Sequence, residues 1–392
     1  MFFNEFAPLE FNIDEILDLN KKDTFFVSDW NKTEKLIDFP NNYLNPIKNN
    51  LVINKNRYYF SDEFQEEKYK FKNSIFKFYN KNINLNNFCI LNNGTSGLFI
   101  IFLILKNLNN DKALVFTPTY FTHINVFNNI GIKCNFFNVN LVRTGMDIDF
   151  NRLENYIIKE NINLLVVTDP LFGIGLSIGK ENYEILISIC KKYNIWIVID
   201  YLYGGMEWDS DNHIFNECFF SFFEKYEKMV LVESISKRLF LNGMKWCIIY
   251  ANNEIIQNIE NLSVSFLGSL TCIQISLFHE LYSMKNIKEI NEIIHKNIIN
   301  IKLCYEQIQA MLIGTDYFLS NSNSGYFTLM GIPYYRLNNT KGIKAAEFLA
   351  HKVKIITIPH ERYGFILDDF YTFRVNLSLK KDELYYNISK ML

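Results

Sequence analysis

A lysine flanked by small hydroxyl residues follows one of the apolar segments of this chain. The segment runs from Met229 to Val232, and Ser234-Ile-Ser-Lys237 comes directly after it. A lysine amine in such a place can act as a nucleophile that forms an imine with a carbonyl group. An ordinary surface lysine is the simpler alternative. Lys245 lies further on and adds a second positive charge.

A carboxylate and a tyrosine follow another apolar segment. Asp200 comes directly after Ile195–Ile199, and Tyr203 follows it. A carboxylate beside buried residues is costly unless it has a partner. It could cap a helix, bind a metal ion or pair with a cationic ring nitrogen. The metal is the weakest choice because no His or Cys cluster at ligand spacing accompanies it, so we predict no metal site.

Two further turns carry polar or aromatic side chains. Asn93-Gly-Thr95-Ser96-Gly follows a short apolar segment and precedes a helix-length one. Backbone N–H groups and hydroxyls at such a helix start can bind a phosphate, although a plain capped turn is the favoured explanation when the motif is taken alone. Thr117-Pro-Thr-Tyr120 places an aromatic ring after the next segment, where a core tyrosine is the alternative.

These turns follow a series of short apolar segments, which we predict to be strands. The segments are residues 88–91, 113–116, 133–137, 164–168, 195–199 and 229–232. Helical segments separate several of them, one from Ser96 onward and one from Glu181 to Tyr193. Continuous apolar strands alternating with helices indicate a mostly parallel α/β sheet, in which ligands bind beyond the carboxyl ends of the strands.

The last part of the chain has a different pattern. Met284–Met311 reads as one long helix, short strand-like runs follow at residues 326–329, 355–358 and 373–377, and a final helix starts at Lys381. This pattern predicts a smaller α+β unit. We therefore expect an N-terminal segment, residues 1–50, that joins the small domain, a large domain of residues 51–283, and a small domain of residues 284–392.

Composition excludes several classes of protein. The net charge of -2, without long runs of one sign, gives no general attraction to nucleic acid or to an anionic membrane. The N-terminus does not read as a signal peptide, and the longest apolar run, Leu98–Leu105, is too short to span a bilayer. The 7 cysteines stand singly, without a CxxC pair, which indicates reduced thiols and a cytoplasmic location.

The motifs, in their order and spacing, resemble those of the class I and II aminotransferases, the fold-type I enzymes that use pyridoxal phosphate (PLP). The resemblance covers about Tyr58 to Leu379. It implies the aspartate aminotransferase-like fold. It also implies that Lys237 is the Schiff-base lysine, that Asp200 keeps the pyridine nitrogen protonated, and that Tyr203 donates to the ring hydroxyl.

The resemblance assigns further residues to cofactor and substrate. The cofactor residues are Thr95, Ser96 and Ser234 at the phosphate, Tyr120 stacked on the ring, and His123 supporting the carboxylate. Arg374, in Phe-Arg-Val-Asn-Leu, matches the arginine that binds the α-carboxylate of an amino acid substrate. Tyr58 or Tyr59 matches a tyrosine that reaches the phosphate of the neighbouring subunit, so we expect a homodimer.

Two positions depart from the family pattern. The usual Asn-Pro-x-Asn-Pro-Thr-Gly appears as Asp169-Pro-Leu-Phe172-Gly-Ile-Gly175, so Phe172 stands where an asparagine normally holds the ring hydroxyl. Lys245 occupies the place of a phosphate-binding arginine; a lysine neutralises phosphate but lacks the bidentate geometry. Both departures affect the expected reaction.

The first expectation is an aminotransferase acting on an amino acid. The second is a PLP-dependent cyclase, lyase or oxidase of specialised metabolism, because Ala7-Pro-Leu-Glu10 and the altered Asp169 motif show a further likeness to capreomycidine synthase-like enzymes. The third is a binding or regulatory protein of the same fold without catalysis. The presence of Lys237, Asp200 and Arg374 favours an enzyme.

Overall fold

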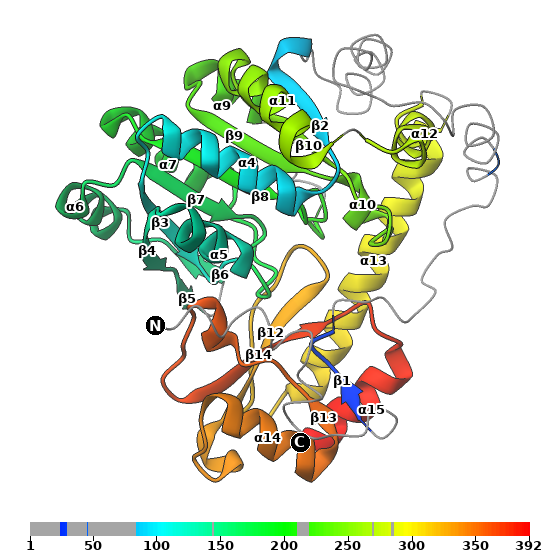
Figure 1. Ribbon diagram of the computed structural model, residues 1–392. Coiled ribbons are helices and arrows are strands. Elements are labelled where there is room, and N and C mark those ends of the chain that lie inside the picture. Colours follow the sequence, from blue (N-terminus) through cyan, green and yellow to red (C-terminus); the bar gives the residue numbers. More distant parts are fainter. Residues whose placement is uncertain are drawn as a thin grey trace.

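A seven-stranded sheet forms the centre of the upper part of the molecule in Figure 1. The computed structural model describes residues 24–29, 45, 84–142, 145–209, 219–268, 270–283 and 286–392. Tyr58, Tyr59 and Ala7–Glu10 lie outside these residues. The sheet order is β2 (Phe88–Leu91), β10 (Cys247–Tyr250), β9 (Met229–Glu233), β8 (Trp196–Tyr201), β7 (Leu164–Thr168), β3 (Lys112–Thr117) and β4 (Lys133–Asn138).

Most neighbouring strands of this sheet run parallel. The pairs β9–β8, β8–β7, β7–β3 and β3–β4 are parallel, whereas β10 is antiparallel to both β2 and β9. The predicted mostly parallel α/β sheet is therefore confirmed. The sequence did not predict β10, whose short apolar stretch was not assigned to an element.

Both faces of the sheet are covered, which explains the continuous apolar strands. Along β3, Leu114 and Phe116 belong to one buried cluster, and Ala113 and Val115 belong to another. Helices α6 (Phe150–Glu160) and α7 (Lys180–Tyr193) contribute to the first cluster, and α4 (Gly94–Asn107), α5 (Phe121–Ile130) and α11 (Asn253–Leu267) to the second. A strand buried on both sides has no position for an alternating polar residue.

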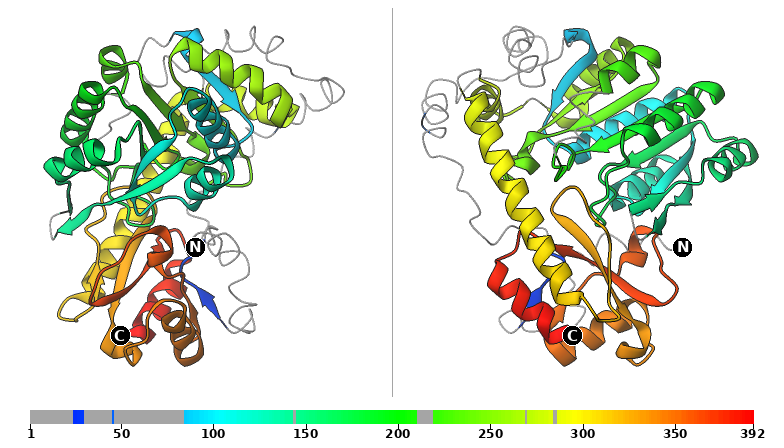
Figure 2. Two further views of the ribbon diagram at one scale, coloured as in Figure 1. Left: turned by 60° about the vertical axis from the view of Figure 1, so that its left-hand side comes forward. Right: turned by 180° about the vertical axis from the view of Figure 1, so that it is seen from behind.

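A smaller unit lies below the large sheet, and the long helix α13 (Ile287–Leu312) runs alongside both parts (Figures 1 and 2). The smaller unit contains an antiparallel sheet in the order β11 (Phe318–Leu319), β12 (Phe327–Pro333) and β14 (Phe370–Asn376). The other elements of this unit are η5 (Tyr334–Leu337), α14 (Gly342–Val353), β13 (Ile355–Ile356), η6 (His360–Tyr363) and α15 (Lys381–Met391).

The described N-terminal residues contact this smaller unit. Strand β1 (Phe25–Phe26) pairs parallel with β13, and the Ser28 hydroxyl donates to the Arg374 carbonyl oxygen at 2.7 Å. The division of the chain at residues 50/51 and 283/284 remains a proposal. The remaining elements are η3 (Leu85–Asn87), β5 (Asn140–Val142), β6 (Gly145–Asp147), α9 (Phe219–Lys225), α10 (Ile235–Arg238) and α12 (Cys272–Leu281).

Some element boundaries differ from those that the sequence predicts. The helix expected from Ser96 begins at Gly94, because the Asn93 side chain caps it by accepting from the Ser96 N–H at 2.8 Å. The strand expected at Ile195–Ile199 extends to Tyr201, so Asp200 lies within the strand instead of after it. The strand-like run expected at residues 355–358 is a strand only at Ile355–Ile356, because its partner β1 also ends after two residues.

Candidate active site

Several predicted site residues meet at the carboxyl edge of the large sheet. Lys237 lies on α10, directly after β9, and Asp200 lies near the end of the neighbouring strand β8. Helix α4 begins at the same edge. A Cβ atom on Gly94 would lie 2.4 Å from a methyl carbon of Leu202, so this helix start packs closely against the turn after β8, and a larger residue would require the Leu202 side chain to move. Residues from three strand ends are thus held together.

Lys237 is half-buried and has a specific partner. Its Nζ donates to Asn242 Oδ1 at 3.1 Å and lies 5.2 Å from the centre of the Tyr203 ring. Burial, together with the positive charge of Lys245, lowers the pKa of Lys237 to about 8, while Asp200 acts in the opposite direction. A sizeable fraction of the amine is therefore neutral, and nucleophilic, near neutral pH.

Asp200 and His123 form a buried pair. His123 Nε2 lies 3.1 Å from Asp200 Oδ2, and the exposed fractions of the two side chains are 0% and 4%. The other ring nitrogen of His123 lies 2.9 Å from the Thr119 hydroxyl oxygen. With Nε2 as the donor to the carboxylate, a neutral ring accepts from Thr119, so both nitrogens are satisfied. The imidazole fixes the position of the carboxylate from behind.

Hydroxyl groups collect where the resemblance places a phosphate. Ser234 and Ser236 are buried, their Oγ atoms are 2.7 Å apart, and Ser234 caps the short helix α10. Thr95 and Ser96 lie in the first turn of α4, and the Thr95 hydroxyl lies 3.5 Å from Tyr120 Oη. Lys245 is exposed, with its charge close enough to lower the pKa of Lys237.

Aromatic rings separate this edge from the smaller unit. Tyr120 lies 5.6 Å from Phe172 between ring centres, and Phe172 lies 4.8 Å from Tyr363. Phe172 is buried, with its backbone oxygen 3.1 Å from His360 Nε2. Burial, with the charge of Arg374, lowers the pKa of His360 to about 3, so this histidine is neutral and donates through Nε2.

Arg374 is fully buried on β14 and held by residues from distant parts of the chain. Its Nε and Nη2 donate to the Ser28 carbonyl oxygen at 3.0 and 2.9 Å, and its Nη1 donates to Tyr363 Oη at 3.3 Å. The guanidinium carbon lies 5.6 Å from the Phe172 ring centre and 5.1 Å from that of Phe327. Aromatic faces stabilise a guanidinium, so the positive charge of Arg374 is held beside the loop of residues 169–175, which carries Phe172 (the Phe172 loop).

A model of the aminotransferase class I and II family matches residues 59–390. The chain belongs to this family. The family uses PLP, and an enzyme of the family is therefore expected to bind PLP at the edge just described.

Individual relatives agree on the fold. A curated aspartate aminotransferase from Pyrococcus horikoshii is 20% identical over 228 residues, which cover 58% of this chain and only 55% of that protein. An aspartate aminotransferase double mutant from Thermus thermophilus superposes with a TM-score of 0.82 at 15% identity, covering 98% of this chain and 96% of that one. A PLP-bound C–S lyase from Staphylococcus hominis gives a TM-score of 0.75 at 17% identity, with 92% and 90% covered. The predicted aspartate aminotransferase-like fold is confirmed.

The residues present fit PLP. Among the described residues, Tyr203 Oη is buried and makes no hydrogen bond of good geometry, although the Tyr326 side chain interacts with it, and the Tyr203 ring lies beside Lys237 Nζ. The ring hydroxyl of a bound cofactor could complete the hydrogen bonding of Tyr203 Oη. Lys237 would hold the cofactor, Asp200 would face its ring nitrogen, and Ser234 with the start of α4 would hold its phosphate. When bound, PLP acts as an electron sink for the substrate carbon.

Sequence reasoning missed several residues that surround the predicted ones. Lys237 contacts Asn242, and Tyr203 contacts Tyr326. The Arg374 guanidinium lies over the Phe327 ring and donates to Tyr363 and Ser28. These residues lack a diagnostic spacing from the lysine. Only Tyr326 and Phe327 carry a signal in the sequence, since Ser324-Gly-Tyr-Phe327 resembles a Gly-Tyr-Phe motif in the small domain of the family.

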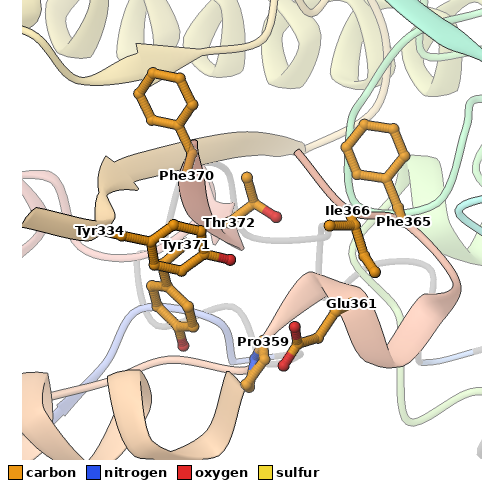
Figure 3. Close-up of a pocket in the computed structure, with 8 residues that line it drawn as sticks. All are labelled: Tyr334, Pro359, Glu361, Phe365, Ile366, Phe370, Tyr371 and Thr372. Atoms are coloured by element: carbon orange, nitrogen blue, oxygen red, sulfur yellow. The ribbon is translucent and has the colours of Figure 1, made fainter. Parts of the chain in front are cut away.

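The pocket in Figure 3 is separate from this site. It lies in the smaller unit and is lined by Tyr334, Pro359, Glu361, Phe365, Ile366, Phe370, Tyr371 and Thr372. None of the predicted site residues lines it. In the described part of the chain, no three His, Cys, Asp or Glu side chains group to hold a metal ion, and no helix is long and apolar enough to cross a membrane.

Proposed function

We propose that this protein is a PLP-dependent aminotransferase acting on an amino acid, with Lys237 as the cofactor lysine. The observation that carries the proposal is the half-buried Lys237 amine, whose pKa lies near 8, at the same sheet edge as the Asp200–His123 pair. Arg374 supports the proposal because its buried guanidinium suits the α-carboxylate that all amino acid substrates share.

The residues have distinct roles in this proposal. Asp200, positioned by His123, stabilises positive charge on the cofactor ring nitrogen. Tyr203 donates its hydroxyl proton to the ring oxygen. The Lys237 amine would hold the cofactor, and as a free amine with a lowered pKa it could act as the general base at the substrate Cα. Thr95, Ser96, Ser234 and Lys245 hold the phosphate, and Tyr120 lies against the ring.

The test is chemical labelling of the cofactor lysine. The purified protein is expected to be yellow, and borohydride reduction should fix PLP to the peptide that contains Lys237, as read by mass spectrometry. Incubation with amino acids and a keto acid acceptor should then release a new amino acid. Labelling at any other lysine would refute the assignment.

A specific observation favours a second candidate, a PLP-dependent lyase, cyclase or oxidase. Phe172 packs between Tyr120 and Tyr363 and offers no donor to the cofactor's ring oxygen. Fewer donors at that oxygen change the electronic properties of the cofactor and favour chemistry in which the substrate stays attached. Products formed from an amino acid without a keto acid acceptor would support this candidate over the first.

The proposed homodimer rests on the likeness to the family, and exposed apolar side chains on two helices are consistent with it. Val264 and Phe266 on α11 and Ile273 on α12 are 38%, 58% and 39% exposed. A large apolar side chain such as Phe266 can contribute to a protein interface. Phe266→Glu should shift the molar mass measured by light scattering from that of a dimer to that of a monomer. The cytoplasmic location rests on the scattered cysteines, and cell fractionation tests it.

A further inference from the structure

The chain turns back on itself directly after the Lys237 helix. Phe240 has a φ of 56°, in the left-handed region that a bulky aromatic residue rarely adopts. Two backbone hydrogen bonds close the turn: Phe240 N–H donates to the Lys237 carbonyl oxygen at 3.1 Å, and Leu241 N–H donates to the Ser236 carbonyl oxygen at 2.8 Å. Such conformations are costly for a residue other than glycine and cluster at functional sites.

The turn has one consequence for the lysine. It returns the chain so that the Asn242 side chain meets the Lys237 amine, with Oδ1 3.1 Å from Nζ. Among the described residues, Asn242 Oδ1 is the only hydrogen-bond acceptor found for Lys237 Nζ. A protonated amine has only donors, so the amide must present its oxygen to it. The Phe240 ring packs 5.2 Å from the Tyr326 ring, which stabilises the turn.

We propose that Asn242 is a positioning residue for Lys237, a neutral acceptor that holds the amine in place whenever the amine is not bonded to the cofactor. The proposal rests on the function proposed above, in which Lys237 is the reactive amine. Asn242 orients Nζ over the Tyr203 ring, 5.2 Å from its centre, instead of leaving a flexible side chain to search for its position.

The neutrality of the amide matters because of the charges around the amine. Lys245, in the loop after the turn, disfavours the protonated amine, Asp200 on β8 favours it, and burial disfavours it most. A carboxylate at position 242 would stabilise the protonated form of the Lys237 amine through its negative charge. The Asn242 amide orients the amine without a negative charge, so the amine remains partly neutral near neutral pH.

The test measures the amine itself in the full-length chain freed of cofactor. An amine-reactive reagent in trace amount labels Lys237 at a rate that follows its neutral fraction, and mass spectrometry of the Lys237 peptide gives the pH midpoint. Asn242→Asp should raise this midpoint by about one pH unit or more, because an opposite charge within hydrogen-bond distance favours the charged form. The control Asn253→Asp adds the same charge at an exposed position and should leave the midpoint unchanged.

A second pair of variants tests the orienting role. Asn242→Ala should slow attachment of added PLP to Lys237 by about tenfold, which corresponds to one lost hydrogen bond to a charged group. Asn242→Thr, which retains an acceptor oxygen, should recover part of that rate. Circular dichroism melting curves verify that each variant is folded.

The outcomes separate this proposal from the proposed function. An Asn242→Asp midpoint that moves no further than that of the Asn253→Asp control overturns the positioning role, and so does an unchanged attachment rate for Asn242→Ala. Borohydride labelling of a lysine other than Lys237 overturns the proposed function instead, whatever the Asn242 variants do to the midpoint of the Lys237 amine.

Discussion

Asp169 and Asp200 stand at the ends of neighbouring strands, and both are shielded from solvent, with 0% and 3% of their surface exposed. The Asp169 N–H even donates to the Asp200 carbonyl oxygen at 2.9 Å. Their side chains, however, have different partners. Asp200 meets the His123 imidazole, a basic group, whereas Asp169 accepts from two neutral donors, Tyr183 Oη at 3.0 Å and the Ile178 N–H at 3.2 Å.

The two aspartates also differ in what their partners do. Burial, with the nearby carboxyl group of Glu207, raises the pKa of Asp169 to about 7, so this side chain holds a proton in part of the neutral range. Asp169 anchors the loop that carries Phe172 through Ile178 and Tyr183. Asp200 has an imidazole nitrogen of His123 within hydrogen-bond distance, and in the proposed function it faces the ring nitrogen of the cofactor. Two equally buried aspartates thus have different partners and different proposed roles.

The largest effect is expected from Asp200→Asn, which keeps the size and removes the charge. In the proposed function Asp200 faces the cationic ring nitrogen of the cofactor, and loss of one member of such a charge pair costs about 2–5 kcal/mol, so kcat/KM should fall about 30-fold to several thousand-fold. Steady-state kinetics at saturating PLP measure kcat/KM for the wild type and the variant. Asp169→Asn is the matched change one strand away and should lower kcat/KM far less. Equal losses in the two variants would break the distinction between the two aspartates.

Arg374→Ala tests the residue that faces the Phe172 loop. Loss of the bidentate charged contact should raise the KM of a carboxylate substrate by the equivalent of about 2–4 kcal/mol. Since Arg374 also binds Ser28 and Tyr363, a lower melting temperature is expected as well. Tyr363→Phe serves as the control, because it removes only one neutral partner. Unchanged kinetics in Arg374→Ala would refute the substrate role.

The proton on Asp169 predicts a pH dependence of stability. Its pKa is raised from 3.8 to about 7 in the fold, so the folded chain binds a proton that the unfolded chain has lost between these values. The stability from this group is complete below pH 4 and is lost as the pH rises to about 7, on the order of 2–4 kcal/mol in total.

Asp169→Asn should remove this loss, because an amide can accept from Ile178 and donate to the Tyr183 oxygen at every pH. Urea unfolding at pH 5 and pH 8 measures the change in unfolding free energy for each protein. The change should be smaller in the variant, whereas Asp368→Asn, at an exposed site, should behave as the wild type. Parallel pH dependences of the wild type and Asp169→Asn would show that Asp169 is already charged in the fold.

The smallest effect concerns Phe172→Asn, in the loop that Asp169 anchors. An amide donor at the ring oxygen stabilises the charged form of that oxygen, so the cofactor's visible absorbance band should titrate about one pH unit lower. The amino-transfer half-reaction should become faster. If the wild-type protein already interconverts rapidly between its PLP and pyridoxamine phosphate forms, Phe172 does not direct the chemistry, and the plain aminotransferase proposal stands.

Much of the large unit could be predicted from the sequence because its signals are local. Apolar segments such as Leu164–Thr168 and Met229–Val232 fill strands that are buried on both faces, and a buried strand tolerates few polar residues. The carboxyl ends of parallel strands meet at one edge, so residues that follow them, such as Lys237, are brought together by the topology. Strand β10 was missed because an apolar stretch of only four residues carries little signal.

Only the tertiary structure decided how these residues are supported. Arg374 meets Phe172 and the Ser28 carbonyl oxygen through packing between distant segments, which no spacing in the sequence encodes. The contact of Asn242 with Lys237 depends on the left-handed backbone of Phe240, a conformation that sequence propensity disfavours. The different partners of Asp169 and Asp200, and the raised pKa of Asp169, follow from their neighbours in space. The sequence determines which groups follow the apolar strands, because apolar runs and the polar residues at their ends are local features, and parallel strands bring those ends to one edge. Their protonation and orientation depend on long-range contacts, because electrostatic and hydrogen-bond energies are set by the atoms within a few ångströms.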